Sequence, residues 1–195
     1  VTHIRGDKLE NPKSIAVGLT TAVDPAFSVS TRADRTAIAN IATDADGNIY
    51  ELEFIYERLH TSLLLDAIDA NHTKIQPHTG VIETTAAQIF IAEELYRSRG
   101  INYIHDKPQT KKTGEGSRIE RLQPFMVNGK FFCKKGSPLR SELLSYPRGK
   151  DDYSDALEKA VRFRASPRYK DPAKNSDEAN LQMKGRRKHY DYMVA

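Results

Sequence analysis

Residues 36–56 read TAIANIATDADGNIYELEFIY, and this stretch decides the fold. An apolar run over residues 36–43 is followed by Asp46-Gly47 and then by a second apolar run over residues 49–56. Asp-Gly between two such runs is a strong hairpin signal, because both residues tolerate the backbone angles of a tight turn. The stretch therefore predicts two antiparallel strands that are neighbours in a sheet.

The flanking sequence predicts alternating strands and helices. Residues 14–23 indicate a strand that ends at Asp24-Pro25, because proline cannot continue a central strand. Gly100 stands where a helix commonly ends with a left-handed residue. We expect further strands over 80–83 and 101–104, a hairpin at Asn128-Gly129 over 126–132, and helices over 61–71, 84–99, 117–122, 138–145 and 151–164.

This order of elements predicts an α/β domain with a mixed central sheet flanked by helices and an added β-hairpin. It is the order of the ribonuclease H-like architecture. We assign residues 15–165 to this domain, residues 1–14 to a linker or frayed terminus, and residues 166–195 to a polar, basic tail. The 195-residue chain suits one domain of this size.

Composition excludes several classes of protein. Hydrophobic residues make up 38% of the chain and charged residues 29%, which is too apolar for a disordered chain. No apolar run approaches the roughly 18 residues of a membrane span, so we expect no membrane partner. The single cysteine, Cys133, excludes an internal disulfide and a zinc site made of cysteines. No P-loop motif is present, so we expect no ATPase activity from this chain.

Acidic residues stand at the ends of the predicted strands and at the start of the last helix. Asp24 closes the first strand, Glu83 closes the strand over 80–83, and Asp151, Asp152 and Asp155 open the helix over 151–164. Adjacent strand ends converge on one edge of an open α/β sheet, where ligands bind. Clustered carboxylates repel each other, and hard divalent cations such as Mg²⁺ or Mn²⁺ remove that conflict.

Two such ions can together cleave a phosphodiester, which makes a two-metal nuclease the expected activity. Each acid also has a simpler interpretation. Asp24 before Pro25 is ordinary turn chemistry, and Glu83, Asp151 and Asp152 are acids of the kind that favour a helix N-terminus. Asp34 is a weaker metal candidate, because it lies between two arginines where a solvated charge is the simpler reading.

Basic residues are concentrated in the second half of the chain. Residues 1–100 hold 9 Lys and Arg against 14 Asp and Glu, whereas residues 101–195 hold 21 against 12. A Gly-, Lys- and Thr-rich loop over residues 105–117 carries part of this charge. Such residues bind backbone phosphates without reading sequence, or else form a solvated loop. The DNA-binding candidates are Lys107, Lys111, Lys112, Arg118, Arg121 and Lys150.

Four stretches carry a resemblance to a known family: VGLTTAVDPAFSVSTRADRTAIA (17–39), GVIETTAAQ (80–88), KTGEGSRIERLQPFMVNGKFF (112–132) and LRSELLSYPRGKDDYSDALEKA (139–160). The sequence resembles the C-terminal nuclease domain of the large terminase subunit of tailed double-stranded DNA bacteriophages. The last stretch is the most specific, with Glu-Leu, an aromatic-Pro-x-Gly and then Asp-Asp-x-x-Asp-Ala-Leu.

The resemblance implies metal-dependent cutting of DNA concatemers during genome packaging, with Asp24, Glu83 and Asp152 as the catalytic acids. It also implies two Mg²⁺ or Mn²⁺ ions held by Asp24, Glu83, Asp151, Asp152 and Asp155. Lys150 stands where the family often has a histidine. The implied partners of a full subunit are an ATPase domain, a small terminase subunit and the portal, in the host cytoplasm during capsid assembly. We expect the isolated domain to be monomeric.

Two other functions fit the same residues. The first is a Holliday-junction resolvase or integrase-like nuclease of the same architecture, which would cut a junction far faster than a linear duplex. The second is a DNA-binding or portal-docking module without catalysis, which would bind DNA in a salt-sensitive way and cleave nothing.

Overall fold

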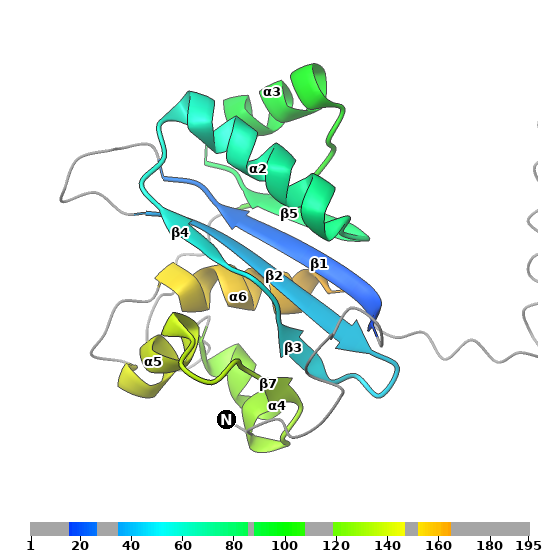
Figure 1. Cartoon of the computed structure of the whole chain (residues 1–195), viewed down its shortest axis with the longest axis vertical. Coiled ribbons are helices and arrows are strands. Elements are labelled where there is room, and N and C mark those ends of the chain that lie inside the picture. The colour runs from blue at the N-terminus through cyan, green and yellow to red at the C-terminus, as the bar shows by residue number, and fades with distance from the viewer. Residues whose placement is uncertain (1–15, 27–34, 86–87, 108–118, 147–151, 165–195) are drawn as a thin grey trace, which may run out of the picture.

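The computed structural model describes residues 16–26, 35–85, 88–107, 119–146 and 152–164. Within them, seven strands form one mixed sheet in the order β6–β5–β1–β2–β3–β7, and β4 pairs with β2 beyond the end of β3 (Figure 1). Strands β1, β5 and β6 are parallel to each other, whereas β2 is antiparallel to β1. The strands are β1 (Ala16–Asp24), β2 (Thr36–Asp44), β3 (Ile49–Glu51), β4 (Ile55–Glu57), β5 (Thr79–Glu83), β6 (Ile104–Asp106) and β7 (Phe131–Phe132).

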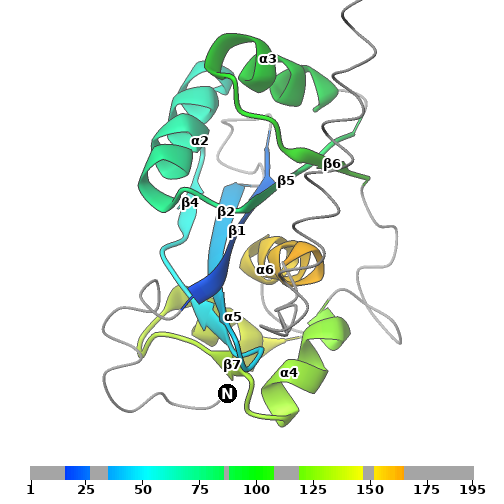
Figure 2. The same cartoon turned by 90° about the vertical axis from the view of Figure 1, so that its right-hand side faces the viewer.

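Helices cover both faces of this sheet. The helices α2 (Thr61–Ile75) and α3 (Ile89–Arg99) lie over one face, and α6 (Asp152–Phe163) crosses the other (Figure 2). The 3₁₀-helix η2 (Ile119–Leu122), α4 (Gln123–Val127) and α5 (Pro138–Ser145) pack into the same core as α6. The prediction of a mixed sheet flanked by helices is confirmed. No helix in the described part of the chain is both long and apolar enough to cross a membrane.

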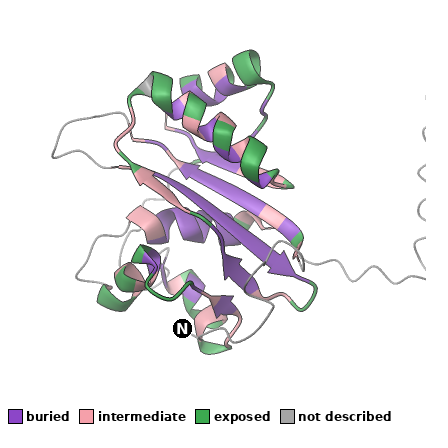
Figure 3. Ribbon diagram, in the orientation of Figure 1, coloured by how far each residue is buried: buried purple, intermediate pink, exposed green. Residues whose placement is uncertain are grey.

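Alternation along the central strands divides the core in two. Ala22 and Val81 pack with α6, whereas Val23 and Ile82, the next residues along β1 and β5, pack with α2 and α3. Successive side chains of a strand point to opposite faces, so this pattern is the expected one. Figure 3 shows the result, with β1, β2 and most of α6 buried and the outer surfaces of α2 and α3 exposed.

The Asp46-Gly47 hairpin is confirmed, because β2 and β3 are antiparallel and Gly47 has a φ of 77°. The strand expected over residues 49–56 is not continuous. Glu51 lies opposite Ile41 and Ile55 lies opposite Ile38, so one extra residue bulges out between β3 and β4. Because a one-residue shift moves a side chain to the other face, the bulge turns Tyr56 towards α6.

Asn40 holds this bulge in place from the neighbouring strand. Its buried amide nitrogen donates to the backbone oxygen of Glu53 at 2.7 Å and to Asn71 Oδ1 on α2 at 2.8 Å. The Asn40 backbone oxygen also accepts from the Leu52 amide at 3.0 Å. Asn71, which we expected at the end of its helix, lies inside it, because α2 continues for one more turn and buries Ile75.

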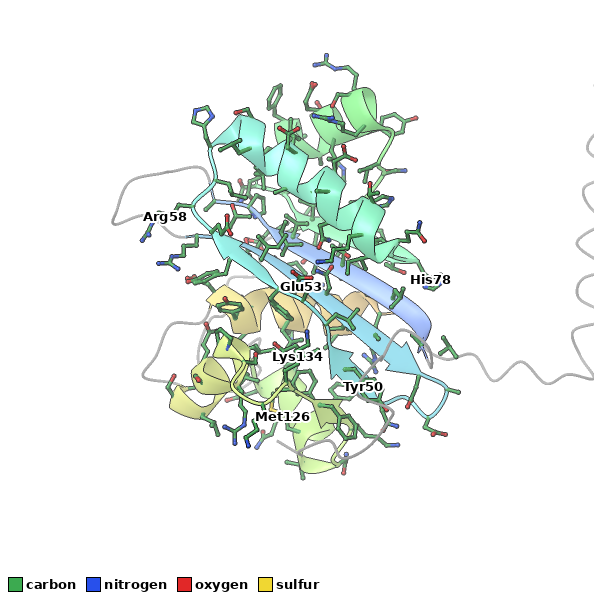
Figure 4. The ribbon with its side chains drawn as sticks, viewed as in Figure 1. Tyr50, Glu53, Arg58, His78, Met126 and Lys134 are labelled. Atoms are coloured by element: carbon green, nitrogen blue, oxygen red, sulfur yellow. The ribbon has the colours of Figure 1, made fainter. Side chains whose placement is uncertain are left out.

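The added hairpin over residues 126–132 is wrong. Residues 123–127 form α4, and β7 pairs in parallel with β3 rather than with the segment before the turn. Asn128 has a φ of −79°, whereas the two-residue hairpin turn favoured by Asn-Gly needs positive φ at both residues. Pro124 favours a helix start, and Met126 packs against the α6 core from α4 (Figure 4).

Two other elements have boundaries that differ from the predictions. The helix expected over 84–99 begins at Ile89 in the described residues, since Thr84 and Thr85 continue from β5 without helical structure. The strand expected over 101–104 instead spans Ile104–Asp106. Ile101 and Tyr103 are buried side chains of the connection before it, which accounts for the apolar run. The domain boundaries at residues 15 and 165 and the assignments of the two termini stay predictions, because these termini lie outside the described residues.

Gly80 of β5 lies against the ring of Tyr103, and this contact predicts a large loss of stability on substitution. A Cβ at Gly80 would stand 2.1 Å from Tyr103 Cδ1. We expect Gly80→Ala to lower the free energy of unfolding by about 3 kcal/mol, as overpacking of a tight core does. Urea unfolding measures the change.

Gly100→Ala is the control for this prediction, because its φ is 70° and nothing lies within 4 Å of the added carbon. It should cost only the backbone strain, about 1 kcal/mol. Equal losses in the two variants would show that the Tyr103 contact contributes nothing.

Candidate active site

One row of side chains crosses five strands on the face covered by α6. Tyr56 of β4 lies opposite Ala37 of β2, and Ala37 lies opposite Asp24 of β1. The parallel register of β1 and β5 places Glu83 beside Asp24, and Glu83 lies opposite Asp106 of β6. Three acids therefore end three neighbouring parallel strands, at the edge where ligands bind in open α/β sheets.

A buried lysine lies between the first two of these acids. The Lys159 ammonium is 3.5 Å from Asp24 Oδ2 and donates a hydrogen bond to Glu83 Oε2. Lys159 is only 1% exposed. Lysine is almost never this buried unless it is paired, so the two carboxylates keep the ammonium in the interior.

The polar residues of α6 that face this row follow the helical repeat. Asp152, Asp155, Lys159 and Arg162 are spaced by three, four and three residues, which places them on one stripe of the helix. Tyr56 donates to Asp152 at one end of the stripe, and Arg162 Nη1 lies 3.2 Å from Asp106 Oδ1 at the other end. We call the row of side chains across the sheet the acid row, and the four α6 residues its facing stripe.

Asp155 lies between those contacts on the same stripe and is 4% exposed. Because neighbouring stripe positions are separated by only one helical turn, its carboxyl lies on α6 between Asp152, which contacts Tyr56, and Lys159. The helix thus carries two acids towards the part of the row that holds Asp24.

Glu142 of α5 fixes the start of α6. Its carboxylate accepts from the Ser154 amide at 2.7 Å and from the Tyr153 amide at 3.3 Å. These amides belong to the first turn, where helix N–H groups lack partners within the helix. Burial raises the pKa of Glu142, while the bonds from Ser154 and Tyr153 oppose that rise. A carboxylate from α5 therefore holds the turn that carries Asp152.

Arginine and tyrosine surround the Asp152 end of the row. The Arg35 guanidinium stacks over the Tyr56 ring at 4.9 Å. Burial and the hydrogen bond to Asp152 raise the pKa of Tyr56, so its hydroxyl stays protonated as a donor. Figure 4 shows Arg58, which follows β4, at the end of the sheet opposite to Tyr50. The cationic side chains of Arg35 and Arg58 thus lie at the end of the sheet where β1 ends.

The structure brings together two of the predicted site acids and places two more nearby. Asp24 and Glu83 share Lys159, whereas Asp152 and Asp155 lie along the facing stripe of α6. Asp151 and Asp34 lie outside the described residues. Across the described residues, no three His, Cys, Asp or Glu side chains are grouped closely enough to hold a metal ion.

The predicted DNA-binding residues are mostly outside the described part of the chain, as Lys111, Lys112, Arg118 and Lys150 are. Lys107 is exposed directly after β6. Arg121 Nη1 lies 3.1 Å from the buried carboxylate of Glu158, although the Arg121 side chain stays 43% exposed. Arg121 also lines a cavity of about 140 Å³ with Arg162 and Arg164.

Sequence reasoning missed Lys159, Asp106, Tyr56 and Glu142. The stripe spacing of Asp152, Asp155 and Lys159 was a usable signal, because it puts a lysine on the same helix face as the acids. The place of Tyr56 in the site could not be predicted from spacing, because the orientation of its side chain depends on the bulge between β3 and β4.

Comparison with known proteins identifies the fold. The sequence matches no protein-family model and no curated protein closely enough to establish a relationship. The structure is similar to the large terminase nuclease of thermophilic phage G20c with bound magnesium, at a TM-score of 0.56 and 18% identity over 74% of this chain and 82% of that one. The chain has a ribonuclease H-like fold.

Two other solved structures share this fold. The HK97 bacteriophage large terminase is similar at a TM-score of 0.55 and 12% identity, over 74% of this chain and 39% of that longer one. The yeast mitochondrial Holliday junction resolvase is similar at a TM-score of 0.51 and 13% identity, over 73% of this chain and 75% of that one. The ribonuclease H-like fold is thus common to terminase nucleases and junction resolvases. Similarity of fold therefore does not distinguish between these two roles.

The carboxylates at the strand ends are ligands of the type that a hard divalent cation takes. The side chains that meet at the strand ends offer only carboxylate oxygens, which are the ligands that Mg²⁺ and Mn²⁺ prefer. The Asp24–Glu83 pair also holds a cationic group between its carboxylates, since the Lys159 ammonium lies there. In the structure, the positive charge that this pair binds is the ammonium of Lys159.

Proposed function

We propose that this chain is a metal-dependent endonuclease that cuts double-stranded DNA. The observation that supports the proposal is the pair Asp24 and Glu83, which ends two adjacent parallel strands and encloses a buried cationic group. The fold of metal-dependent DNA nucleases supports the same activity.

Asp24 and Glu83 would hold the first divalent cation, and Asp152 and Asp155, with Asp151, would supply ligands from α6. When bound, Mg²⁺ or Mn²⁺ ions stabilise the negative charge that develops on a phosphodiester during hydrolysis. Glu142 keeps the first turn of α6 in place, and the Tyr56 hydroxyl orients Asp152. The ends of β1 and β5 form one side of the proposed site, and α6 forms the other side.

DNA would approach along the edge that carries Arg35, Arg58 and Lys107. These cations lie near the ends of β2, β4 and β6 and can contact backbone phosphates, which position a duplex without specifying its sequence. The basic loop after Lys107 and the tail beyond residue 165 would add to this attraction. We therefore expect little sequence preference and binding that weakens steeply with salt.

Within this activity, we propose the role of a terminase nuclease domain. Three of the four sequence stretches with the terminase pattern contain Asp24, Glu83, Asp152 and Asp155, all of which lie on the acid row or on its facing stripe. In that role the chain would cut DNA concatemers in the host cytoplasm during capsid assembly, alongside an ATPase domain, a small terminase subunit and a portal. The second candidate is a junction resolvase, which the structural likeness to the yeast enzyme favours.

A panel of DNA substrates tests both roles. Supercoiled plasmid, linear duplex and a four-way junction of matched sequence are incubated with the full chain and Mn²⁺, with a chelator as control. We expect plasmid and linear duplex to be cut at rates within about tenfold of the junction. A junction cut more than about a hundredfold faster would establish the resolvase role, and no cleavage of any substrate would contradict the proposed function.

A further inference from the structure

Lys159, on the stripe of α6 that faces the acid row, carries a charge that opposes the proposed cation. It is buried, it contacts both Asp24 and Glu83, and it is held by a helix that packs on β1, β2 and β5. Its ammonium neutralises one of the two negative charges of the pair. A divalent cation that binds the same oxygens must meet this ammonium at contact distance.

We propose that Lys159 is a built-in counter-ion of the Asp24–Glu83 pair that a divalent cation must displace to bind. The proposal rests on the metal-dependent function proposed above and adds a means of regulating the same site. While Lys159 lies between them, the two carboxylates are held together and the protein is stable without metal. When Lys159 leaves, both carboxylates become ligands for the ion.

The side chain is able to make this exchange. Lysine is a point charge on a flexible four-carbon stem, so the ammonium can move while α6 stays in place. Asp155 lies one turn earlier on the same stripe, and Arg162 lies one turn later in contact with Asp106. The displaced ammonium would therefore move away from the positively charged Arg162.

The exchange has an energetic consequence that can be measured. Removing the ammonium removes both the competitor for the carboxylates and the repulsion that an incoming cation meets. The protein without Lys159 should therefore bind divalent cations more tightly, although its cation-free form should be less stable. Metal affinity and stability thus change in opposite directions, which the loss of a lysine that does not touch the pair would not produce.

The test compares Mn²⁺ binding to the wild-type chain and to Lys159→Met by titration calorimetry without DNA. We expect the Kd of Lys159→Met to fall by at least about tenfold, which corresponds to about 1.4 kcal/mol. The melting temperature of this variant should be below wild type without metal and should rise more steeply with Mn²⁺. Lys135→Met, which removes an exposed lysine, should match the wild type.

Lys159→Arg covers the case in which Lys159→Met does not fold. Arginine keeps the charge and grips carboxylates with a fork of donors, so Mn²⁺ should bind at least about threefold more weakly than to wild type. Equal or tighter binding by Lys159→Arg, or no gain in affinity for Lys159→Met, would overturn the inference. If wild type still binds Mn²⁺ and cuts DNA in that case, the proposed function survives; if no variant binds a divalent cation, both fail.

Discussion

Asp24→Asn will leave the protein folded and will cut DNA at least about a thousandfold more slowly. Asp24 ends β1 beside Glu83, and its carboxylate lies 3.5 Å from the Lys159 ammonium on the facing stripe of α6, so it is placed to hold a cation from the strand side. Losing one anionic ligand removes about 4 kcal/mol of transition-state stabilisation. Single-turnover cleavage of linear duplex with Mn²⁺ measures the rate.

Folding of this variant is checked by thermal melting. Asp24 is partly exposed and lies 3.5 Å from the Lys159 ammonium, so its neutralisation should change the free energy of unfolding by less than about 1 kcal/mol. Asp46→Asn in the β2–β3 turn removes an exposed acid and should keep full activity. Cleavage by Asp24→Asn at more than a tenth of the wild-type rate, about 1.4 kcal/mol, would refute the assignment of Asp24.

Glu83→Gln will destabilise the protein far more than Asp24→Asn does. Glu83 accepts a hydrogen bond from Lys159, and both side chains are almost entirely buried. Without this carboxylate the buried ammonium keeps only its more distant contact with Asp24. Breaking a buried ion pair from one side leaves an uncompensated charge, so we expect a loss of about 3 kcal/mol in urea unfolding.

A double-mutant cycle isolates the interaction energy between Glu83 and Lys159. Glu83→Gln combined with Lys159→Met should recover at least about 1.5 kcal/mol relative to the sum of the single losses. Glu93→Gln on the exposed side of α3 is the control and should stay within about 0.5 kcal/mol of wild type. A loss below that limit for Glu83→Gln would show that the contact with Lys159 adds no stability.

The sequence was sufficient for the parts of the fold that depend on local pattern. The Asp46-Gly47 turn, the strand ends at Asp24 and Glu83 and the amphipathic last helix follow from turn chemistry and hydrophobic periodicity. Because Asp24 and Glu83 end parallel strands, their convergence on one edge followed from topology alone. The structure places them side by side.

The rest depended on contacts between distant segments. Asn128-Gly129 satisfies a hairpin rule locally, but Pro124 and the packing of Met126 on the α6 core make the preceding residues helical. The bulge that turns Tyr56 towards Asp152 is held by Asn40 on another strand, which no pattern within residues 49–56 reveals. The burial of Lys159 likewise depends on carboxylates that are 76 residues and more away in sequence.

The most direct measurement is a crystal soaked in Mn²⁺ and recorded at a wavelength where manganese scatters anomalously. Binding of a cation by Asp24 and Glu83 predicts an anomalous peak about 2–2.5 Å from carboxylate oxygens of both residues. An anomalous map with no peak at either carboxylate, from protein that cuts DNA in the same Mn²⁺ solution, would contradict it.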